Sequence, residues 1–320
     1  MTWMLTGGAG YIGAHIVRAF QAIDLPVVVL DDLSSGVREN VPPDVPFVHA
    51  PVQDSDAVRR AVREHGVTGL LHLAAKKAVG ESVEKPLLYW DENVGGMVNL
   101  LQSCVDEGVD RVLFSSSAAV FGTPPVELVT EETPTAPMST YGETKLVGEW
   151  VLRDLATARP SLRWAALRYF NVAGAGAPEL GDRSVGNLVP MTFQAFTDGR
   201  NPQLFGNDYD TRDGSCVRDY IHVVDLAEAH AAAARRLDEE ALGEVYNVGR
   251  GEGVTVKEVF ERVRAVTGVD FEVDVVDRRA GDPAAYYADA TKIAEQLGWT
   301  ARLDLDEMVR TAWESWQSQH

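Results

Sequence analysis

Tyr141 and Lys145 stand four positions apart in a segment that is expected to be helical, so both side chains lie on the same helix face. A free phenol has a pKa of about 10, and it becomes a base at neutral pH only if a nearby positive charge stabilises the phenolate. The Lys145 ammonium group is such a charge. Ser117 closes a run of three serines at the end of an expected strand, the edge where open α/β sheets bind ligands. The three residues predict a proton-transfer site, in which Ser117 bridges Tyr141 and a substrate hydroxyl.

A glycine-rich turn, GGAGYIG at residues 7–13, joins the first expected strand to the first expected helix. Its glycines permit a tight turn and let backbone N–H groups approach a pyrophosphate, whose charge the helix N-terminus favours. Asp31 ends the second expected strand, where a carboxylate binds the adenosine ribose and repels a 2′-phosphate. The pattern predicts an NAD site, and the positive nicotinamide ring would also favour the Tyr141 phenolate. Alternatively, the glycine-rich turn has only a structural role, and Asp31 is an acidic residue that begins a loop.

Composition narrows the classes of partner. The chain has 320 residues and a net charge of -19, which argues against nucleic acid because phosphate binding needs clustered cations. Any anionic substrate must therefore be held by a few well-placed Lys or Arg side chains. Cys104 and Cys216 lack the spacing of metal ligands, so we expect no metal and free thiols in a cytoplasmic protein. No apolar run approaches the roughly 18 residues of a membrane span, and the first residues do not resemble a signal peptide.

The elements that must position these residues alternate between short apolar runs and amphipathic stretches, the pattern of a parallel sheet with crossover helices. We predict an α/β fold: a doubly wound, Rossmann-type parallel sheet in an NAD-binding domain, residues 1–175, and a smaller mixed α/β substrate domain, residues 176–320. Some segments of the second domain can pack back on the first sheet. The expected strands are 3–6, 27–30, 47–49, 69–73, 112–115 and 163–169. The expected helices are 11–23, 54–64, 95–107, 139–158, 189–197, 226–237, 256–267, 291–297 and 305–316.

Taken together, the motifs resemble the extended short-chain dehydrogenase/reductase family, and within it the 4-epimerases of UDP-hexoses. The resemblance runs nearly end to end. Its motifs are GGAGYIG (7–13), DDLSSG (31–36), HLAAKKAVGESVEKP (72–86), SSSAAVFG (115–122), YGETK (141–145), RYFNVAGA (168–175), FGNDYDTRDGSCVRDYIHVVDLA (205–227), YNVG (246–249) and RRAGDPAAYYAD (278–289). The first and fifth are shared by the whole family, whereas the segments around residues 77–82, 205–223 and 278–283 favour the epimerases.

The resemblance implies an activity on UDP-glucose and UDP-galactose, with NAD as a cofactor that stays bound. Tyr141 would be the acid/base at the sugar 4-hydroxyl, assisted by Ser117, and Lys145 would orient the nicotinamide ribose and lower the phenol pKa. A hydride leaves carbon 4, the resulting 4-keto sugar rotates about its diphosphate linkage, and the hydride returns to the opposite face. Anchoring by UDP and loose retention of the sugar fit this sequence of events. Members of the family are usually homodimers, so a homodimer is expected.

The resemblance also implies which residues bind each ligand. The implied cofactor residues are Gly7, Gly10, Tyr11, Ile12, Gly13, Asp31, Asp32, Leu33, Ser35, Gly36, Val52, Leu73, Ala74, Ala75, Lys77, Tyr141, Lys145 and Phe170. The implied substrate residues are Lys77, Ser117, Tyr141, Asn171, Asn187, Leu188, Phe205, Arg218, Arg279, Asp282 and Tyr286. Within that second set, Arg218 and Arg279 would neutralise the diphosphate, since a guanidinium fork matches phosphate oxygens. Asp282 would bind the uridine ribose, and the bulk of Tyr286 would disfavour N-acetylated sugars.

Three places depart from the family pattern. The third strand is followed by Ala50-Pro51 where the family has Gly-Asp, and proline supplies neither the carboxylate that contacts the adenine amino group nor an N–H. Asp54 or a backbone carbonyl could substitute. Glu92 replaces an asparagine beside Asn93, either disturbing cofactor contacts or facing solvent. Ala119 and Phe121 stand where hydroxyl side chains are common, a loss of about 1 kcal/mol for one hydrogen bond.

Several alternatives share the fold. A nucleotide-sugar 4,6-dehydratase would need an acid and a base after the serine strand, where Ala118-Ala119 cannot transfer protons. An epimerase of another UDP-sugar, a pentose, a uronic acid or an N-acetylhexosamine, keeps the same base and stays open. A non-catalytic NAD-binding regulator would be expected to lack the tyrosine that this chain retains as Tyr141.

Overall fold

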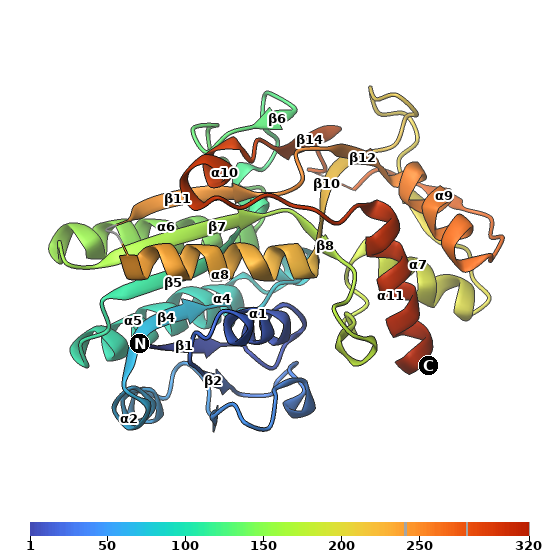
Figure 1. Ribbon diagram of the computed structural model, residues 1–320. Coiled ribbons are helices and arrows are strands. Elements are labelled where there is room, and N and C mark those ends of the chain that lie inside the picture. The colour runs from blue at the N-terminus through green and yellow to red at the C-terminus, as the bar shows by residue number, and fades with distance from the viewer. Residues whose placement is uncertain (240–241, 280, 320) are drawn as a thin grey trace.

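The computed structural model describes residues 1–239, 242–279 and 281–319. Its largest feature is a seven-stranded, fully parallel sheet with the order β11-β7-β5-β4-β1-β2-β3 (Figure 1). The strands are β1 (Thr2–Thr6), β2 (Val27–Asp31), β3 (Phe47–His49), β4 (Val67–His72), β5 (Arg111–Ser117), β7 (Arg163–Tyr169) and β11 (Gly243–Val248). The order reverses direction at β1, so the ends of β1 and β4 flank the switch point at which such sheets bind ligands.

Helices cover both faces of this sheet, which confirms the predicted doubly wound fold. On one face lie α1 (Tyr11–Ala22) and α8 (Val223–Glu239), which pack against each other. On the other lie α2 (Ser55–His65), α5 (Gly96–Asp106) and α6 (Thr140–Ala158). A separate apolar core fills each face, with Phe20 among the buried residues of the first and Leu100 among those of the second.

A second lobe lies beyond the carboxyl edge of the sheet (Figure 1). Its mixed sheet has the order β12-β10-β14-β6, with β8 also paired to β10. These strands are β6 (Leu128–Val129), β8 (Asn171–Ala173), β10 (Val217–His222), β12 (Gly253–Thr255) and β14 (Ala285–Ala288), and β9 (Gln203–Phe205) pairs separately with β13 (Asp274–Val276). Its helices are α7 (Leu188–Thr197), α9 (Val256–Thr267) and α11 (Leu305–Gln319), whereas α10 (Thr291–Leu297) packs on β11 and α8 of the first lobe. A third apolar core lies beneath α7, α9 and α11.

The two lobes are interleaved along the chain. The mixed sheet of the second lobe takes β6 and β8 from residues before position 175. In return, α8 and β11, which follow that position, complete the first lobe, where β11 pairs with β7. The boundary at residue 175 therefore stays a prediction, whereas the layers themselves are defined by the strand pairing.

The expected helices and strands agree with the structure to within a few residues, but the six-residue strands β10 and β11 and several shorter elements were not predicted. The segment after β4 forms α3 (Val79–Glu84), α4 (Pro86–Tyr89) and the π-helical η2 (Trp90–Gly95), which runs directly into α5. The structure also has the 3-10 turns η1 (Arg38–Asn40), η3 (Ala118–Phe121) and η4 (Pro178–Leu180). The strand expected at 69–73 instead covers Val67–His72, so Leu73 begins the loop that leaves the sheet.

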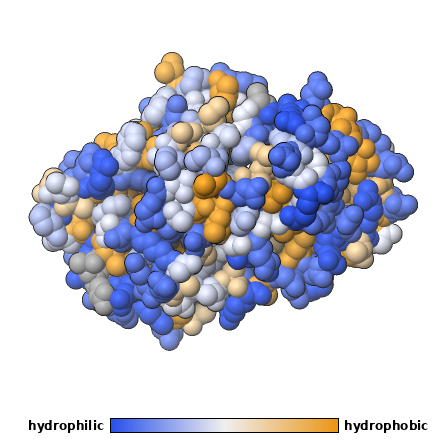
Figure 2. Space-filling model, turned by 90° about the horizontal axis from the view of Figure 1, so that it is seen from above, coloured by the Kyte–Doolittle hydropathy of each residue, from blue (hydrophilic) through white to orange (hydrophobic). Residues whose placement is uncertain are grey.

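The visible surface in Figure 2 is mostly hydrophilic, with apolar residues scattered in small groups. This agrees with a chain whose acidic residues exceed its basic ones, 48 to 29. Within the described part of the chain, no helix combines the length and apolar character needed to cross a membrane.

Candidate active site

The glycine-rich turn between β1 and α1 is so tightly packed that two of its positions require glycine. Gly7 has a φ of +75°, and a Cβ atom there would lie 3.0 Å from the Ala74 nitrogen. A Cβ atom on Gly13 would lie 2.2 Å from the Gly7 carbonyl oxygen. Gly10 is the N-cap of α1 and supplies no side-chain hydrogen bond, so the first N–H groups of the helix stay available to an anion. These features fit the pyrophosphate of a dinucleotide.

Asp31, the last residue of β2, lies against that turn. One carboxylate oxygen accepts a hydrogen bond from the Ala9 N–H at 2.9 Å, and the other accepts from the Leu33 N–H at 2.8 Å. Burial raises the pKa of Asp31, and these two backbone hydrogen bonds oppose the rise. A Cβ atom on Gly36 would lie 2.9 Å from Asp31 Oδ1, so glycine lets the loop after β2 approach. Each carboxylate oxygen can accept more than one hydrogen bond, which leaves capacity for ribose hydroxyls.

The rest of the loop after β2 is more open. Asp32 is exposed and accepts a hydrogen bond from the Ser34 N–H at 2.9 Å, and Ser35 is exposed as well. Leu33 has a φ of +58°, a left-handed conformation that is uncommon for a residue other than glycine. Within the predicted cofactor set, Asp32 and Ser35 are therefore accessible, whereas Asp31 is buried.

The loop after β4 lies directly beside the glycine-rich turn. Leu73 and Ala74 both donate backbone hydrogen bonds to Thr6, at 3.3 Å to its carbonyl and 3.3 Å to its hydroxyl oxygen. Ala75 continues this loop and is exposed. Thr6 thereby ties the ends of β1 and β4 together, and the predicted residues 73–75 meet the predicted residues of the turn.

Lys77 extends from this loop towards the second lobe. The buried side chain of Asn93, in η2, holds the loop by accepting from the Lys76 N–H at 2.8 Å and donating to the Lys76 carbonyl at 3.0 Å. The Lys77 ammonium donates to Ser184 Oγ at 3.2 Å, in the segment that precedes α7. Lys77 therefore joins the two lobes.

The predicted catalytic residues come together where β5 meets α6. Ser117 is the last residue of β5, and Tyr141 and Lys145 lie one turn apart near the start of α6. Ser139 caps that helix, because its side chain accepts from the Gly142 N–H at 3.2 Å. Tyr141 is hydrogen-bonded to Ser117. The Lys145 nitrogen lies 5.8 Å from the centre of the Tyr141 ring.

Burial dominates the protonation behaviour of both helix residues. Burial raises the pKa of Tyr141, and the hydrogen bond with Ser117 opposes the rise. Burial also lowers the pKa of Lys145 to about 7. The lysine donates to the Ser115 carbonyl at 2.7 Å, so its ammonium is directed at the strand. The lowering of the Tyr141 pKa that the spacing to Lys145 predicts is thus outweighed by desolvation in the protein itself.

Glu149, two turns beyond Tyr141 on the same face of α6, belongs to a buried network that the sequence reasoning missed. Its carboxylate accepts from Arg168 Nε at 2.9 Å and Nη2 at 2.7 Å, and from the Ser116 hydroxyl. The network joins α6 to β5 and β7 immediately beneath Ser117. The spacing of Glu149 from Lys145, four positions on one helix, was the signal available in the sequence.

Arg218, Asp282 and Tyr286 gather on the second lobe. Arg218 lies opposite Tyr286 in the β10–β14 pair, with its guanidinium 5.2 Å from the ring centre. It donates to Asp282 at 3.2 Å, so its ion pair is not with the neighbouring Asp219. The Phe170 ring centre lies 5.6 Å from that of Tyr286, which brings a residue of the predicted cofactor set against the predicted substrate set.

Arg279 and Phe205 continue this group. The Arg279 guanidinium stacks 3.7 Å from the centre of the Phe205 ring, at the end of β9. The Arg279 carbonyl accepts from the Asp282 N–H at 3.2 Å, so the backbone of this turn holds Arg279 beside the residue whose carboxylate binds Arg218. Two guanidinium groups beside aromatic faces can bind a diphosphate and a planar base.

Asn171, Asn187 and Leu188 lie on the segments between the lobes. The Asn171 amide donates to the Asp219 carbonyl at 2.9 Å, at the start of β8. Asn187 is the N-cap of α7, and its amide donates to Asp182 at 2.6 Å, while Leu188 is the first residue of that helix. Their positions follow from these hydrogen bonds, so both amides are fixed before a ligand arrives.

Asp219 is a second structural residue that the sequence reasoning missed. Its carboxylate accepts three backbone hydrogen bonds, from Arg250 at 2.9 Å, Gly251 at 3.0 Å and Ala288 at 3.1 Å. The side chain is fully buried, and burial raises its pKa to about 6 against the effect of those hydrogen bonds. Asp219 thereby fixes β10 to β14, and with them Arg218 opposite Tyr286.

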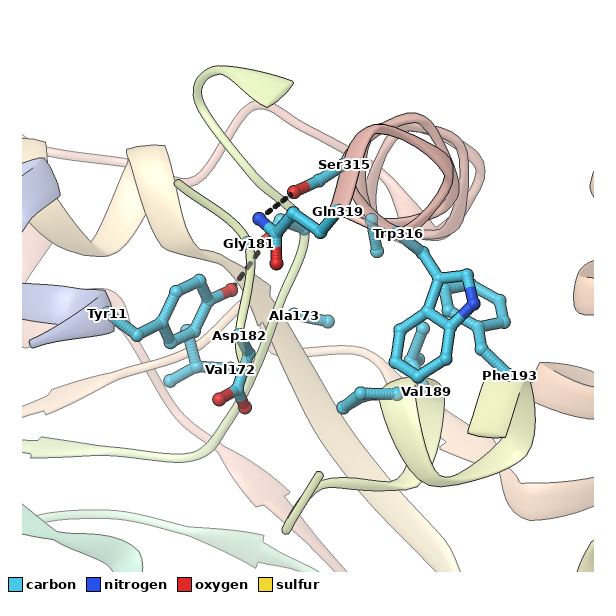
Figure 3. A pocket seen from close by; sticks show the side chains of 13 residues that line it. Tyr11, Val172, Ala173, Gly181, Asp182, Val189, Phe193, Ser315, Trp316 and Gln319 are labelled. Atoms are coloured by element: carbon cyan, nitrogen blue, oxygen red, sulfur yellow. Dashed lines mark hydrogen bonds between the residues drawn. The ribbon is translucent and has the colours of Figure 1, made fainter. Parts of the chain in front are cut away.

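A narrow, mostly apolar pocket lies where the glycine-rich turn meets the second lobe (Figure 3). The Tyr11 ring forms one wall, and its hydroxyl donates to the Gly174 carbonyl at 2.6 Å. Val189 and Trp316 lie on the opposite side in Figure 3, and Asp182, the partner of Asn187, lies between the two walls. The adjoining Ile12 packs against the core of the first lobe. Tyr11 thus fastens the turn to the loop that follows β8.

The departures from the family pattern have structural explanations. Asp54, offered as a substitute for the missing acid, caps α2 by accepting from the Ala57 N–H at 2.9 Å. Glu92 does not simply face solvent, because it accepts from the Gln53 side chain at 2.9 Å. In the described ranges, no three His, Cys, Asp or Glu side chains form a group that could hold a metal ion.

The two apolar replacements also lie close to the catalytic residues. The Ala119 N–H donates to Ser117 Oγ at 3.2 Å, so this hydroxyl is oriented by the main chain of η3. Phe121 is fully buried, and the Arg168 guanidinium lies 5.0 Å from its ring centre. Their apolar side chains therefore support the serine and the ion pair instead of offering hydroxyl groups.

A fold of this kind, with a glycine-rich dinucleotide turn and a Ser-Tyr-Lys group at the edge of the sheet, defines a class of nucleotide-dependent enzymes. The family model for the NAD dependent epimerase/dehydratase family matches residues 3–249, and the chain belongs to that family.

Individual relatives are more specific. The chain is 43% identical to a UDP-glucose 4-epimerase of Azospirillum brasilense, over 98% of this chain and 91% of the relative. A structure of the UDP-glucose 4-epimerase of Stenotrophomonas maltophila with NAD and formylated UDP-arabinopyranose superposes with a TM-score of 0.95 at 38% identity, covering 100% of this chain and 98% of the other. The enzyme of Bifidobacterium longum in complex with NAD+ and UDP gives a TM-score of 0.92 at 36% identity, covering 100% and 98%.

Proposed function

We propose that the protein is an NAD-dependent 4-epimerase that interconverts UDP-glucose and UDP-galactose. The observation that carries the proposal is the placement of Ser117, Tyr141 and Lys145 between the dinucleotide turn and the Arg218 group of the second lobe. The full-length similarity to UDP-glucose 4-epimerases supports the choice of reaction.

The residues of the chain would divide the chemistry as follows. NAD, held by the glycine-rich turn and Asp31, would supply the hydride acceptor at carbon 4 and the source of the hydride for the opposite face of the 4-keto sugar. Tyr141 takes the proton of the 4-hydroxyl and later gives it back, and Ser117 holds that hydroxyl in line. The ammonium form of Lys145 stabilises the phenolate and hydrogen-bonds the ribose, and its lowered pKa lets it change charge near neutral pH.

The second lobe would hold the substrate by its UDP group. Arg218 and Arg279 neutralise the diphosphate, Asp282 binds the uridine ribose and Phe205 contacts the base. Asn171, Asn187, Leu188 and Lys77 border the sugar and the linkage. Because the charged diphosphate and the uridine anchor the substrate, the sugar itself can be held loosely and present either face after oxidation.

Tyr286 is proposed to limit the range of sugars. Its ring lies between Arg218 and Phe170, which leaves a bulky side chain beside the sugar site. N-acetylated UDP-hexoses should therefore react much more slowly than UDP-glucose. Equal rates on UDP-N-acetylglucosamine and UDP-glucose would contradict this part of the proposal. The exchange Tyr286→Ala should reduce the difference between these two rates.

The protein is also proposed to be a cytoplasmic homodimer. The free, buried thiols Cys104 and Cys216 suit a reducing compartment. The adjacent helices α3, α4, α5 and α6 expose apolar side chains, with exposed fractions of 62% at Val83, 81% at Leu87 and 46% at Trp150. Such a surface suits a contact with a second copy. Light scattering should give twice the chain mass, and Leu87→Glu should lower it, whereas an unchanged mass would place the contact elsewhere.

The direct test is proton NMR of the purified protein with UDP-galactose, with and without added NAD+. Growth of the UDP-glucose anomeric signal without added cofactor would support epimerisation with retained NAD. Conversion only after addition of NAD+ would indicate weak retention at the adenine side. No conversion in either sample would reject this substrate pair, and UDP-pentoses and UDP-uronic acids would be tested next.

A further inference from the structure

The segment 50–54, directly after β3, borders the adenine end of the dinucleotide site. Asp31, the residue suited to the adenosine ribose, is paired in register with His49 at the end of β3. The Ala50 N–H then donates to the Asp31 carbonyl at 3.2 Å. A base attached to that ribose must extend beyond β2 along the carboxyl edge, which is where this segment lies.

Most oxygen atoms of this segment already accept hydrogen bonds from the protein. Pro51 has no N–H and no polar side chain, and the Val52 side chain is apolar and buried. Several acceptors are engaged: the carbonyls of Pro51, Val52 and Gln53 accept from the Asp54 N–H, the Asn99 side chain and the Ser55 N–H, and one Asp54 carboxylate oxygen accepts from the Ala57 N–H. Within the described part of the chain, no such partner is seen for the Ala50 carbonyl, the other Asp54 carboxylate oxygen or the side-chain oxygen of Gln53. Of these three, the Gln53 oxygen belongs to the group that another side chain, Glu92, orients.

The orientation of the Gln53 amide is fixed by chemistry. Its nitrogen donates to Glu92 Oε2 at 2.9 Å, and an ionised carboxylate can only accept, so the amide nitrogen must face Glu92 and the oxygen must face away. A Cβ atom on Gly96 would lie 3.0 Å from Val52 and 3.2 Å from the Gln53 nitrogen. Glycine at the start of α5 therefore lets the Gln53 side chain lie beside buried Val52.

We propose that Gln53, oriented by Glu92, accepts a hydrogen bond from the 6-amino group of adenine. The two departures at Pro51 and Glu92 would then be one compensated change, in which an amide held by a carboxylate supplies the acceptor that proline lacks. This inference rests on the proposed NAD site, and it adds a recognition element for the base. Gln53 is a binding residue in this scheme, and Glu92 is a positioning residue.

The arrangement predicts selectivity for the base. Hypoxanthine carries an oxygen in place of the 6-amino group, so nicotinamide hypoxanthine dinucleotide would set two acceptors against each other. One hydrogen bond of this kind contributes roughly a fivefold to tenfold change in affinity. Removing the constraint at Glu92 has a different effect, because an amide that is free to flip can accept from adenine or donate to hypoxanthine.

The test compares the dissociation constants of NAD+ and nicotinamide hypoxanthine dinucleotide by calorimetry, using the full-length protein freed of bound cofactor. The wild type should prefer NAD+ about fivefold to tenfold. Gln53→Ala should lose most of that preference and bind NAD+ correspondingly more weakly. Glu92→Gln should lose the preference with little change in NAD+ affinity. The matched control is Gln102→Ala, because Gln102 is an exposed glutamine on α5 that likewise donates to a carboxylate, that of Asp106, at 2.7 Å.

Each other outcome argues against the proposal. Equal binding of the two dinucleotides by the wild type would overturn it, as would an unchanged preference in Gln53→Ala. A preference lost in Glu92→Gln but kept in Gln53→Ala would make Glu92 the acceptor. A wild type that does not bind NAD+ would reject the proposed cofactor site itself. A Gln53→Ala variant that still catalyses epimerisation and keeps the wild-type preference for NAD+ over the hypoxanthine dinucleotide would reject only the role of Gln53. Melting temperatures of the variants identify any loss of folding.

Discussion

Two successive turns of α6 carry buried charged groups, one of which has a charged partner and one of which does not. Lys145 is 3% exposed, donates to the Ser115 carbonyl and has a pKa lowered to about 7 by burial alone. Glu149, one turn on and 4% exposed, is fully partnered by Arg168 and Ser116. Both side chains face the same strands, so the difference lies in their partners and not in their depth.

This difference separates a residue kept for chemistry from a residue kept for structure. A buried charge with a matched counter-ion is held in place, and removing one member leaves the other exposed to the full desolvation cost. A buried ammonium without a carboxylate lowers stability but can change protonation near neutral pH, which suits a group that must respond to a cofactor and a phenol. The helix therefore combines a rigid anchor with an adjustable catalytic end.

The largest expected effect comes from breaking the anchor. Glu149→Gln would leave the buried Arg168 guanidinium without its counter-ion, and we expect the free energy of unfolding to fall by about 3 to 5 kcal/mol. Urea unfolding followed by circular dichroism measures this change. The exchange Glu314→Gln, at an exposed ion pair with Arg310, is the control and should change stability by less than about 1 kcal/mol. Equal losses of stability in Glu149→Gln and Glu314→Gln would mean that the buried ion pair on α6 contributes no more than an exposed one.

At the catalytic end of α6, Tyr141→Phe should lower the reaction rate without lowering the stability of the protein. The phenyl ring keeps the packing but cannot transfer a proton, so kcat should fall by roughly 10² to 10⁴. The Michaelis constant, the NAD content and the melting temperature should change little. A variant that keeps more than about a tenth of the wild-type rate would assign the proton transfer to another group.

Lys145→Met should uncouple activity from stability. Methionine fills a similar volume without a charge to desolvate, so the free energy of unfolding at pH 7 should rise by about 1 to 2 kcal/mol while the activity is lost. Urea titrations of the variant and the wild type at one pH measure the difference. A clear fall in stability would mean that the hydrogen bond to Ser115 outweighs the cost of the buried ammonium group.

The last prediction concerns the pH dependence of stability. The pKa of Lys145 is about 7 in the folded protein and 10.5 as the ordinary value, so between these values the unfolded chain binds the extra proton. The stability of the wild type relative to Lys145→Met should therefore rise with pH above 7, by at most about 1.4 kcal/mol per pH unit. A difference that stays flat between pH 7 and 9 would show that the lysine remains charged throughout.

The catalytic end of α6 was predictable from sequence because its chemistry depends on near neighbours in the chain. Tyr141 and Lys145 share one helix turn, and the glycine-rich turn is contiguous, so spacing alone indicates both. Ser117 needed one further step, the expectation that ligands bind where parallel strands end. The doubly wound sheet followed from the same alternation of strands and helices.

The residues missed were those whose partners are distant in sequence. Asp219 reaches the backbone of Arg250 and Ala288, and Glu149 on α6 reaches Arg168 on β7. No local pattern reports which backbone N–H a buried carboxylate will meet, because that depends on how the sheets are assembled. The short strands β6, β8 and β14 were missed for the same reason, since two to four residues carry almost no periodic signal.

The interleaving of the lobes has a consequence for biosynthesis. When about the first seven-tenths of the chain has left the ribosome, the large sheet still lacks its edge strand β11. This strand, Gly243–Val248, is synthesised after β6, β8, β9 and β10 of the second lobe. The α8 face that covers α1 is equally late. The first lobe therefore stays incomplete, with part of its core uncovered, until segments far beyond its glycine-rich turn have been synthesised. A nascent chain of this protein should need chaperones until β11 has emerged, and not only until residue 175 has emerged.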